Sequence, residues 1–282
     1  MAVVVVCVLL VLAGLLAVVR WGGLAVQPPP TPGGTARQLR VGVVVRHYLW
    51  YVTVALAAGV TAGILAAGAG GRLVMRLLAV TAGPTAQGQI TEANEIVGRI
   101  SVGGTVGFFL FIGVPFGVAA AAAYLLLRRW LPNGRAGGLT LGVLLLIVVG
   151  TRIDPLRSNN PDFSLVGPAW VAVVAFVALG LFHGMVIAAL AGRYSQALPL
   201  VASRPRALAA YARLLLLIPL FLVILVIIGV GLVAVVVSQL QPVVALWHDR
   251  RVVMVGRVAL AAVGLVALPG FVSALVEILG PT

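Results

Sequence analysis

Lysine is absent from this 282-residue chain, and acidic side chains are scarce, since all 19 basic residues are arginine against six aspartates and glutamates. Without lysine no retinal Schiff base can form, which excludes a rhodopsin. The single cysteine, Cys7, excludes an internal disulfide and a cysteine-rich metal site. The Walker A, Rossmann, HExxH and GxSxG motifs are also missing, so the enzyme classes that these motifs mark are not indicated.

The sequence also lacks the patterns expected for a haem site or a nucleic-acid-binding segment. The three histidines, His47, His183 and His248, fall at different predicted depths, whereas a b-type haem needs two at matched depth. The net charge of +13 comes from arginines at the edges of apolar runs rather than from one long basic segment. We therefore predict no cofactor, no resident metal and no nucleic-acid partner.

Apolar residues make up 62% of the chain and charged residues only 9%, which leaves too little polar surface for a soluble domain. A run of about 20 apolar residues crosses the hydrocarbon core of a bilayer. The sequence therefore predicts an all-α integral membrane protein whose first partner is the lipid bilayer. Its bundle of about seven transmembrane helices would lie at 2–19, 48–70, 104–127, 138–153, 168–190, 214–239 and 257–279.

These spans divide the chain into an N-terminal transmembrane helix (1–20), a cytoplasmic linker (21–47) and a six-helix bundle (48–282). The linker contains QPPPTPGGT, a composition typical of connecting segments. The fourth span is the weakest, because its apolar part is only LTLGVLLLIVVG. Polar external loops are expected at 71–103 and 152–167.

The arginines predict the orientation of the bundle. Eleven lie in the connections on one side of the predicted spans and eight on the other, and five of the six acidic residues accompany the eight. Because positive charge is retained in the cytoplasm, we expect an external N-terminus and a cytoplasmic C-terminus. Arginine without lysine, with abundant alanine, valine, glycine and leucine, indicates a high-GC genome and a bacterial plasma membrane.

Two polar segments interrupt the apolar pattern. Residues 151–163 read TRIDPLRSNNPDF, and the segment 84–103 also carries mixed charge, with Thr91 as the expected N-cap of a short helix. Unpaired charges are costly at a membrane edge. We therefore expect the two segments to touch, through Arg152 or Arg157 with Glu92 or Glu95, or through Asp154 or Asp162 with Arg72, Arg76 or Arg99.

The candidate ligand-binding residues combine these loops with one intramembrane side chain. They are Arg72, Arg76, Glu92, Glu95, Arg152, Asp154, Arg157, Asp162 and His183. The charged residues either pair with each other to lock the loops or form a shallow site for an anionic group. His183 either lies in a solute path or donates as a neutral imidazole to a backbone carbonyl of a neighbouring helix.

Helix packing is predicted from small residues. GxxxG spacings occur at Gly59/Gly63, Gly103/Gly107, Gly113/Gly117 and Gly180/Gly184, where helices can approach closely. Pro115, Pro219 and Pro269 interrupt predicted spans, so kinks are expected there.

The motifs GRLVMR, TEANEIVGRI with GGT, and TRIDPLRSNNPDF leading into VGPAW are similar to those of a group of uncharacterised multi-pass membrane proteins from actinobacteria. The resemblance covers roughly residues 71–193. It implies a membrane location and says nothing about chemistry, because the group has no assigned activity.

The sequence is compatible with three functions. The bundle binds or passes a small solute or ion, with the external loops as its mouth and His183 in the path. Alternatively it is a non-catalytic subunit or scaffold, whose partners are other membrane subunits or further copies of itself. The third alternative is an enzyme acting on a lipid headgroup, with Arg72, Arg76, Arg152 and Arg157 holding phosphate and Glu92, Asp154 or Asp162 as the base.

Overall fold

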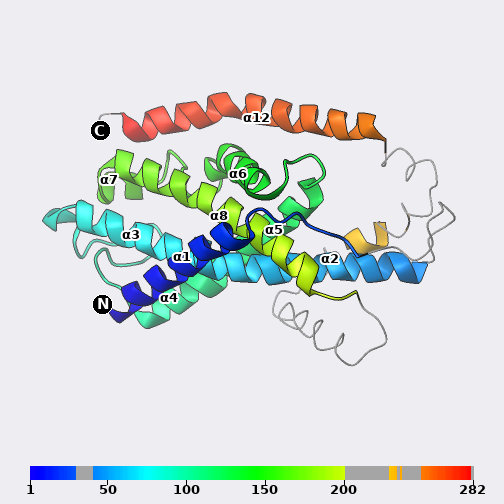
Figure 1. Ribbon diagram of the computed structural model, residues 1–282. Helices are drawn as coiled ribbons and strands as arrows, with labels where there is room; N and C mark the ends of the chain where they lie inside the picture. Colours follow the sequence, from blue (N-terminus) through cyan, green and yellow to red (C-terminus); the bar gives the residue numbers. More distant parts are fainter. Residues whose placement is uncertain (30–40, 201–228, 234–235, 237–248, 281–282) are drawn as a thin grey trace.

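The computed structural model describes residues 1–29, 41–200, 229–233, 236 and 249–280. Helices form the architecture of this part, as predicted (Figure 1). They are α1 (Ala2–Trp21), α2 (Val41–Ala62), α3 (Ala69–Thr81), α4 (Val102–Phe108), α5 (Val114–Leu127), α6 (Gly134–Leu145), α7 (Asp162–Leu165), α8 (Ala169–Ala197) and α12 (Arg250–Leu279).

Three π-helical segments join some of these helices end to end. Gly63–Gly68 connects α2 with α3, Phe109–Gly113 connects α4 with α5, and Leu146–Gly150 extends α6. The first junction produces one continuous helix, Val41–Thr81. Two predicted boundaries therefore move: the linker expected at 21–47 ends in helix, and the start of the loop expected at 71–103 is helical, so that Arg72 and Arg76 belong to α3.

Five helices are long and apolar enough to cross a membrane, namely Ala2–Trp21, Val41–Thr81, Val102–Leu127, Ala169–Ala197 and Arg250–Leu279. The weak fourth span corresponds to the shorter apolar helix Gly134–Gly150, which ends before the predicted residue 153. Most of the span predicted at 214–239 lies outside the described residues. The structure thus supports a membrane protein with five candidate spans, and seven remains a prediction.

Glycines bring the helix backbones together along two seams. In the first, Gly59 and Gly63 face Gly113 and Gly117, and a Cβ on Gly113 would lie 2.7 Å from the carbonyl oxygen of Gly63. In the second, α6 packs on α8, and a Cβ on Gly138 would lie 2.6 Å from the carbonyl oxygen of Gly184. Three of the predicted GxxxG pairs therefore lie at helix contacts. Gly103 and Gly107 do not, because open space surrounds both.

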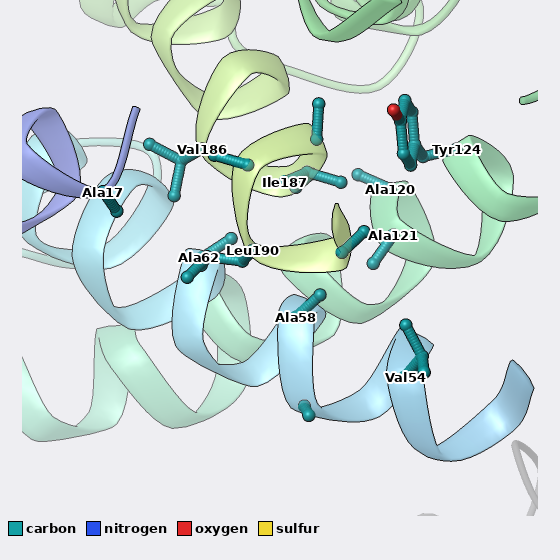
Figure 2. Packing of buried hydrophobic residues seen from close by; sticks show 14 of the residues in the cluster. Ala17, Val54, Ala58, Ala62, Ala120, Ala121, Tyr124, Val186, Ile187 and Leu190 are labelled. Atoms are coloured by element: carbon teal, nitrogen blue, oxygen red, sulfur yellow. The ribbon is translucent and has the colours of Figure 1, made fainter. Parts of the chain in front are cut away.

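The core around these seams consists mostly of small apolar side chains (Figure 2). Ala58 and Ala62 of α2 pack near Ala121 of α5 and Ile187 of α8, and all four are fully buried. At one end of this core the indole of Trp50, also fully buried, donates a 2.9 Å hydrogen bond to the carbonyl oxygen of Leu198. Alanine and glycine permit this close spacing, which helices in lipid need for association.

The first helix is attached to the bundle rather than separated by the linker. A Cβ on Gly14 would meet the ring of Phe182, so α1 and α8 are in close contact. The guanidinium of Arg135 donates to the carbonyl oxygens of Val18, at 3.2 Å, and Val19, at 2.7 Å. These carbonyls belong to the last turn of α1, where a cation is favourable; that of Val18 also accepts from the N–H of Gly22 at 2.9 Å.

We call the end of the bundle that carries residues 82–101 and 151–167 the loop end, and the opposite end the arginine end. Both termini of the described chain lie at the loop end (Figure 1). Near the C-terminus, Ile278 packs in a cluster with Leu156 and Phe163, whereas Gly256 lies against Trp130 at the other end of α12. The structure therefore does not confirm the predicted placement of the two termini on opposite sides of the membrane.

The direction of α12 increases the difference in the number of arginines between the two ends of the bundle. Arg250, Arg251 and Arg257, expected on the external side, lie at the arginine end. Among the described residues this end holds Arg20, Arg46, Arg128, Arg129, Arg135, Arg193, Arg250, Arg251 and Arg257, with Asp249 as its acidic residue. The loop end holds Arg72, Arg76, Arg99, Arg152 and Arg157, with Glu92, Glu95, Asp154, Asp162 and Glu277. The positive-inside rule consequently favours a cytoplasmic arginine end more strongly than before.

The glycine seam yields a matched pair of substitutions. Gly117→Ala should lower the free energy of unfolding by about 1–3 kcal/mol, because the new methyl group overlaps backbone of Gly59 and Gly63. Gly107→Ala should be neutral or slightly stabilising, since nothing lies within 4 Å of its Cβ position. Thermal unfolding in detergent measures both. Equal effects of the two substitutions would contradict the seam.

Candidate functional site

The two polar segments meet at the loop end, as predicted. Arg157 Nη2 forms a salt bridge with the carboxylate of Glu92, and the backbone N–H of Glu92 donates to Asp162 Oδ1 at 2.9 Å. The side chains of the ion pair are 31% and 44% exposed. An exposed pair of this kind contributes little net stability, so its main effect is to fix the relative position of the loops.

Residues 87–99 form a hairpin-like loop and not the helix that Thr91 was expected to cap. Thr91 Oγ1 accepts a hydrogen bond from the backbone N–H of Glu95 and donates to the carbonyl oxygen of the same residue. Ile90 and Ile96 form an isolated antiparallel bridge, and Asn94 adopts a φ of 57°. The threonine side chain therefore offers the backbone an alternative to the helical hydrogen bonds.

The second loop is held by its own turns and by one apolar anchor. Leu156 is fully buried, and its N–H donates to the carbonyl oxygen of Gly150 at 2.8 Å. Asn160 Oδ1 accepts from the N–H of Asp162 at 2.8 Å. The chain then forms the short helix α7 and enters α8 after Pro168, close to the predicted start. With these contacts in place, Asp162 faces the hairpin-like loop 87–99 and Asp154 faces the helix bundle.

The four arginines that were candidates for a phosphate clamp make separate contacts. Arg76 donates to the carbonyl oxygen of Gly98 at 3.1 Å, and Arg152 to that of Val148 at 2.9 Å. Arg157 is paired with Glu92, as described above. Arg72 is buried, with Nε 3.3 Å from Thr105 Oγ1 and its guanidinium 5.6 Å from the ring centre of Phe108. Glu95 forms no salt bridge with Arg72 in the described structure, although both approach Gly104.

A cavity of about 440 Å³ lies between α5, α6 with its π-helical extension, and α8. We call it the groove. Asp154 lines it at the loop end and His183 lines it deep in the bundle, and all its other lining residues are apolar or glycine. Phe116, Leu145 and Gly180 are among them. The structure thereby connects two candidate site residues that are 29 positions apart and leaves the other seven outside the groove.

His183 is the polar side chain at the inner part of the groove. It is 9% exposed, and neither ring nitrogen has a hydrogen-bond partner in the described structure. The expectation that it donates to a backbone carbonyl is therefore wrong. A neutral imidazole provides one donor and one acceptor. In the described structure both ring nitrogens are buried and unused, which costs stability.

Asp154 stands where the groove reaches the loop end. Burial by the surrounding protein raises the pKa of its carboxyl group, and the nearby positive charge of Arg157 partly opposes this shift. Glu92 and Asp162 add smaller contributions that raise the pKa further. The loop contact thus sets the electrostatic environment of the groove mouth as well as its position.

No family model, curated protein or solved structure matches the chain. The site is therefore interpreted from its own geometry. Sequence reasoning identified Asp154 and His183, but it missed the groove that joins them. The lining residues Phe116 and Leu145 carry no signal in the sequence, because they resemble every other apolar residue of a span.

The loop contact can be tested by a double-mutant cycle. Glu92→Gln and Arg157→Gln should each lower the melting temperature slightly, and the double variant should lower it by less than the sum, because the partners interact directly. High salt should shrink this coupling, as expected for exposed charges. Strictly additive effects at low salt would contradict the pairing.

Asp154 should make stability depend on pH. Because its pKa is raised in the folded protein, the folded chain holds a proton that the unfolded chain has already lost, and stability falls as the pH rises through this window. Asp154→Asn removes the effect. The variant should match the wild type below the usual aspartate pKa of about 4 and exceed it at neutral pH. Unfolding measured against pH checks this, and a pH-independent difference would contradict it.

Proposed function

We propose that this protein binds a small, mostly apolar molecule with at least one hydrogen-bonding group, which enters the groove at the loop end and reaches His183. The observation that carries the proposal is the buried imidazole without a protein partner at the inner part of an otherwise apolar cavity. Ligand pockets commonly combine an apolar lining with a few polar groups that orient the ligand, in volumes of about 300–1,000 Å³. The groove has both properties.

The lining favours an apolar solute over an ion. Asp154 and His183 are its two polar side chains, and they lie at different depths. A desolvated ion would need several oxygen or nitrogen ligands around it at one place. An apolar body with a hydroxyl, carbonyl or amide group requires one donor or acceptor, which the imidazole supplies.

Binding is better supported than passage through the bundle. On the side of His183 toward the arginine end, Ile187 is fully buried in the core. The backbones of α6 and α8 are also in contact there, at Gly138 and Gly184. Movement of a solute to the arginine end would require these helices to separate. With the loop end placed outside a bacterial plasma membrane, the proposed ligand comes from the external side.

The two alternative functions have less support. An enzyme acting on a lipid headgroup would bring several arginines to one phosphate, whereas Arg76, Arg152 and Arg157 each contact a different protein group. A scaffold would be expected to expose apolar helix faces, and α12 does so, but lipid covers such faces equally well.

Cysteine labelling tests the groove. In a Cys7→Ser background, Ala119→Cys places a thiol in the groove, and Phe111→Cys places one on a surface that is 77% exposed and does not line it. Position 111 is nearer to the loop end than position 119, because it precedes position 119 by eight residues, which correspond to about 12 Å of helix. A polar thiol reagent added at the loop end should nevertheless react faster at position 119, because the thiolate that reacts needs water.

Protection of that thiol tests the ligand class. A series of linear primary alcohols, each an apolar chain with one hydroxyl group, should slow the labelling of Ala119→Cys, and His183→Leu should weaken this protection. Phe111→Cys serves as the control that alcohols should not protect. Equal labelling rates at the two positions, or protection independent of His183, would contradict the proposal.

A further inference from the structure

A second cavity, of about 650 Å³, lies at the arginine end between α1, α2 and α8. We call it the basal pocket. Arg20 and Trp21 come from the last turn of α1, and Arg193 and Tyr194 from the last turns of α8. Its position is separate from the groove, and the proposed function does not involve it.

The two arginines of the basal pocket carry positive charge that the protein does not neutralise. Within the described residues, Arg20 and Arg193 form no hydrogen bond or ion pair. The Arg193 guanidinium lies 5.8 Å from the ring centre of Trp21, which orients it without removing its charge. The acidic residue described at this end, Asp249, accepts instead from the N–H of Arg251 in α12.

Below the charged rim the basal pocket is apolar. Leu16 precedes Arg20 by four residues and Ala13 precedes Leu16 by three, so that all three share one face of α1. Leu65 continues this apolar surface from the segment after α2. Tyr194 contacts Thr61 with a hydroxyl–hydroxyl distance of 3.1 Å, which fixes the wall between α2 and α8.

We infer that the basal pocket binds an anionic glycerophospholipid from the leaflet at the arginine end. Its phosphate group lies between Arg20 and Arg193, and one acyl chain runs along Leu16 and Leu65. Charged groups above an apolar depth match the two halves of a phospholipid, and basic pockets between helices are suited to such headgroups. Trp21 is the last residue of the candidate span α1, and indole rings prefer the membrane interface, where such a span ends.

Native mass spectrometry of the full chain in detergent tests this site. Phosphatidylglycerol and phosphatidylcholine with identical acyl chains are titrated separately, and the wild type should retain phosphatidylglycerol preferentially. Arg20→Gln/Arg193→Gln should reduce this preference by roughly 30-fold, about fivefold for each arginine near a membrane surface. Arg257→Gln is the matched control, because Arg257 is exposed at the same end and does not line the pocket.

Two further arms separate the remaining explanations. Ala13→Trp fills the apolar part of the basal pocket while both arginines stay in place, and it should weaken binding of both lipids. If the double variant does not fold, Ala13→Trp and the single arginine variants are measured in its place. Glycerol 3-phosphate, which has no acyl chain, should not displace phosphatidylglycerol. Displacement by glycerol 3-phosphate, an equal loss in Arg257→Gln, or unchanged preference in the double variant would each overturn the inference.

Discussion

The close contact of helix backbones at glycine is the constraint on which the rest of the structure depends. Lipid is as apolar as a leucine side chain, so burial alone does not drive helices together in a membrane. Gly59 and Gly63 therefore meet Gly113 and Gly117, and Gly138 meets Gly184, with backbone against backbone. Alanines continue both seams into the core, where residues such as Ala58 and Ala121 are fully buried.

The groove follows from where these seams lie. One seam holds the helix Val41–Thr81 to α5 and the other holds α6 to α8, but no glycine seam joins α5 to α6. Phe116 and Leu145 instead face the space between the two pairs. π-Helical turns adjoin this region at Phe109–Gly113 and Leu146–Gly150, as they often do at functional sites. A bundle packed uniformly would have no room beside His183.

The sequence permitted prediction of contacts that depend on residue type, and not of those that depend on long-range geometry. The pairing of Glu92 with Arg157 was predictable because opposite charges at a membrane edge need partners. The helix expected after Thr91 does not form, because the Thr91 hydroxyl forms hydrogen bonds with the backbone N–H and carbonyl oxygen of Glu95. The direction of α12 was missed since it depends on Ile278 packing against Leu156, and neither apolar residue differs from its neighbours in composition.

The two ends of the bundle balance charge in different ways. At the loop end the described arginines and carboxylates are equal in number, and protein groups neutralise each other there, as Arg157 and Glu92 do. At the arginine end two of the described arginines have neutral partners: Arg128 donates to the hydroxyl of Tyr51 at 2.6 Å, and Arg135 donates to backbone carbonyls of α1. Such contacts orient a guanidinium but leave its charge in place. Neither contact supplies a counter-charge, and the phospholipid site that we infer at this end would supply one through its anionic headgroup.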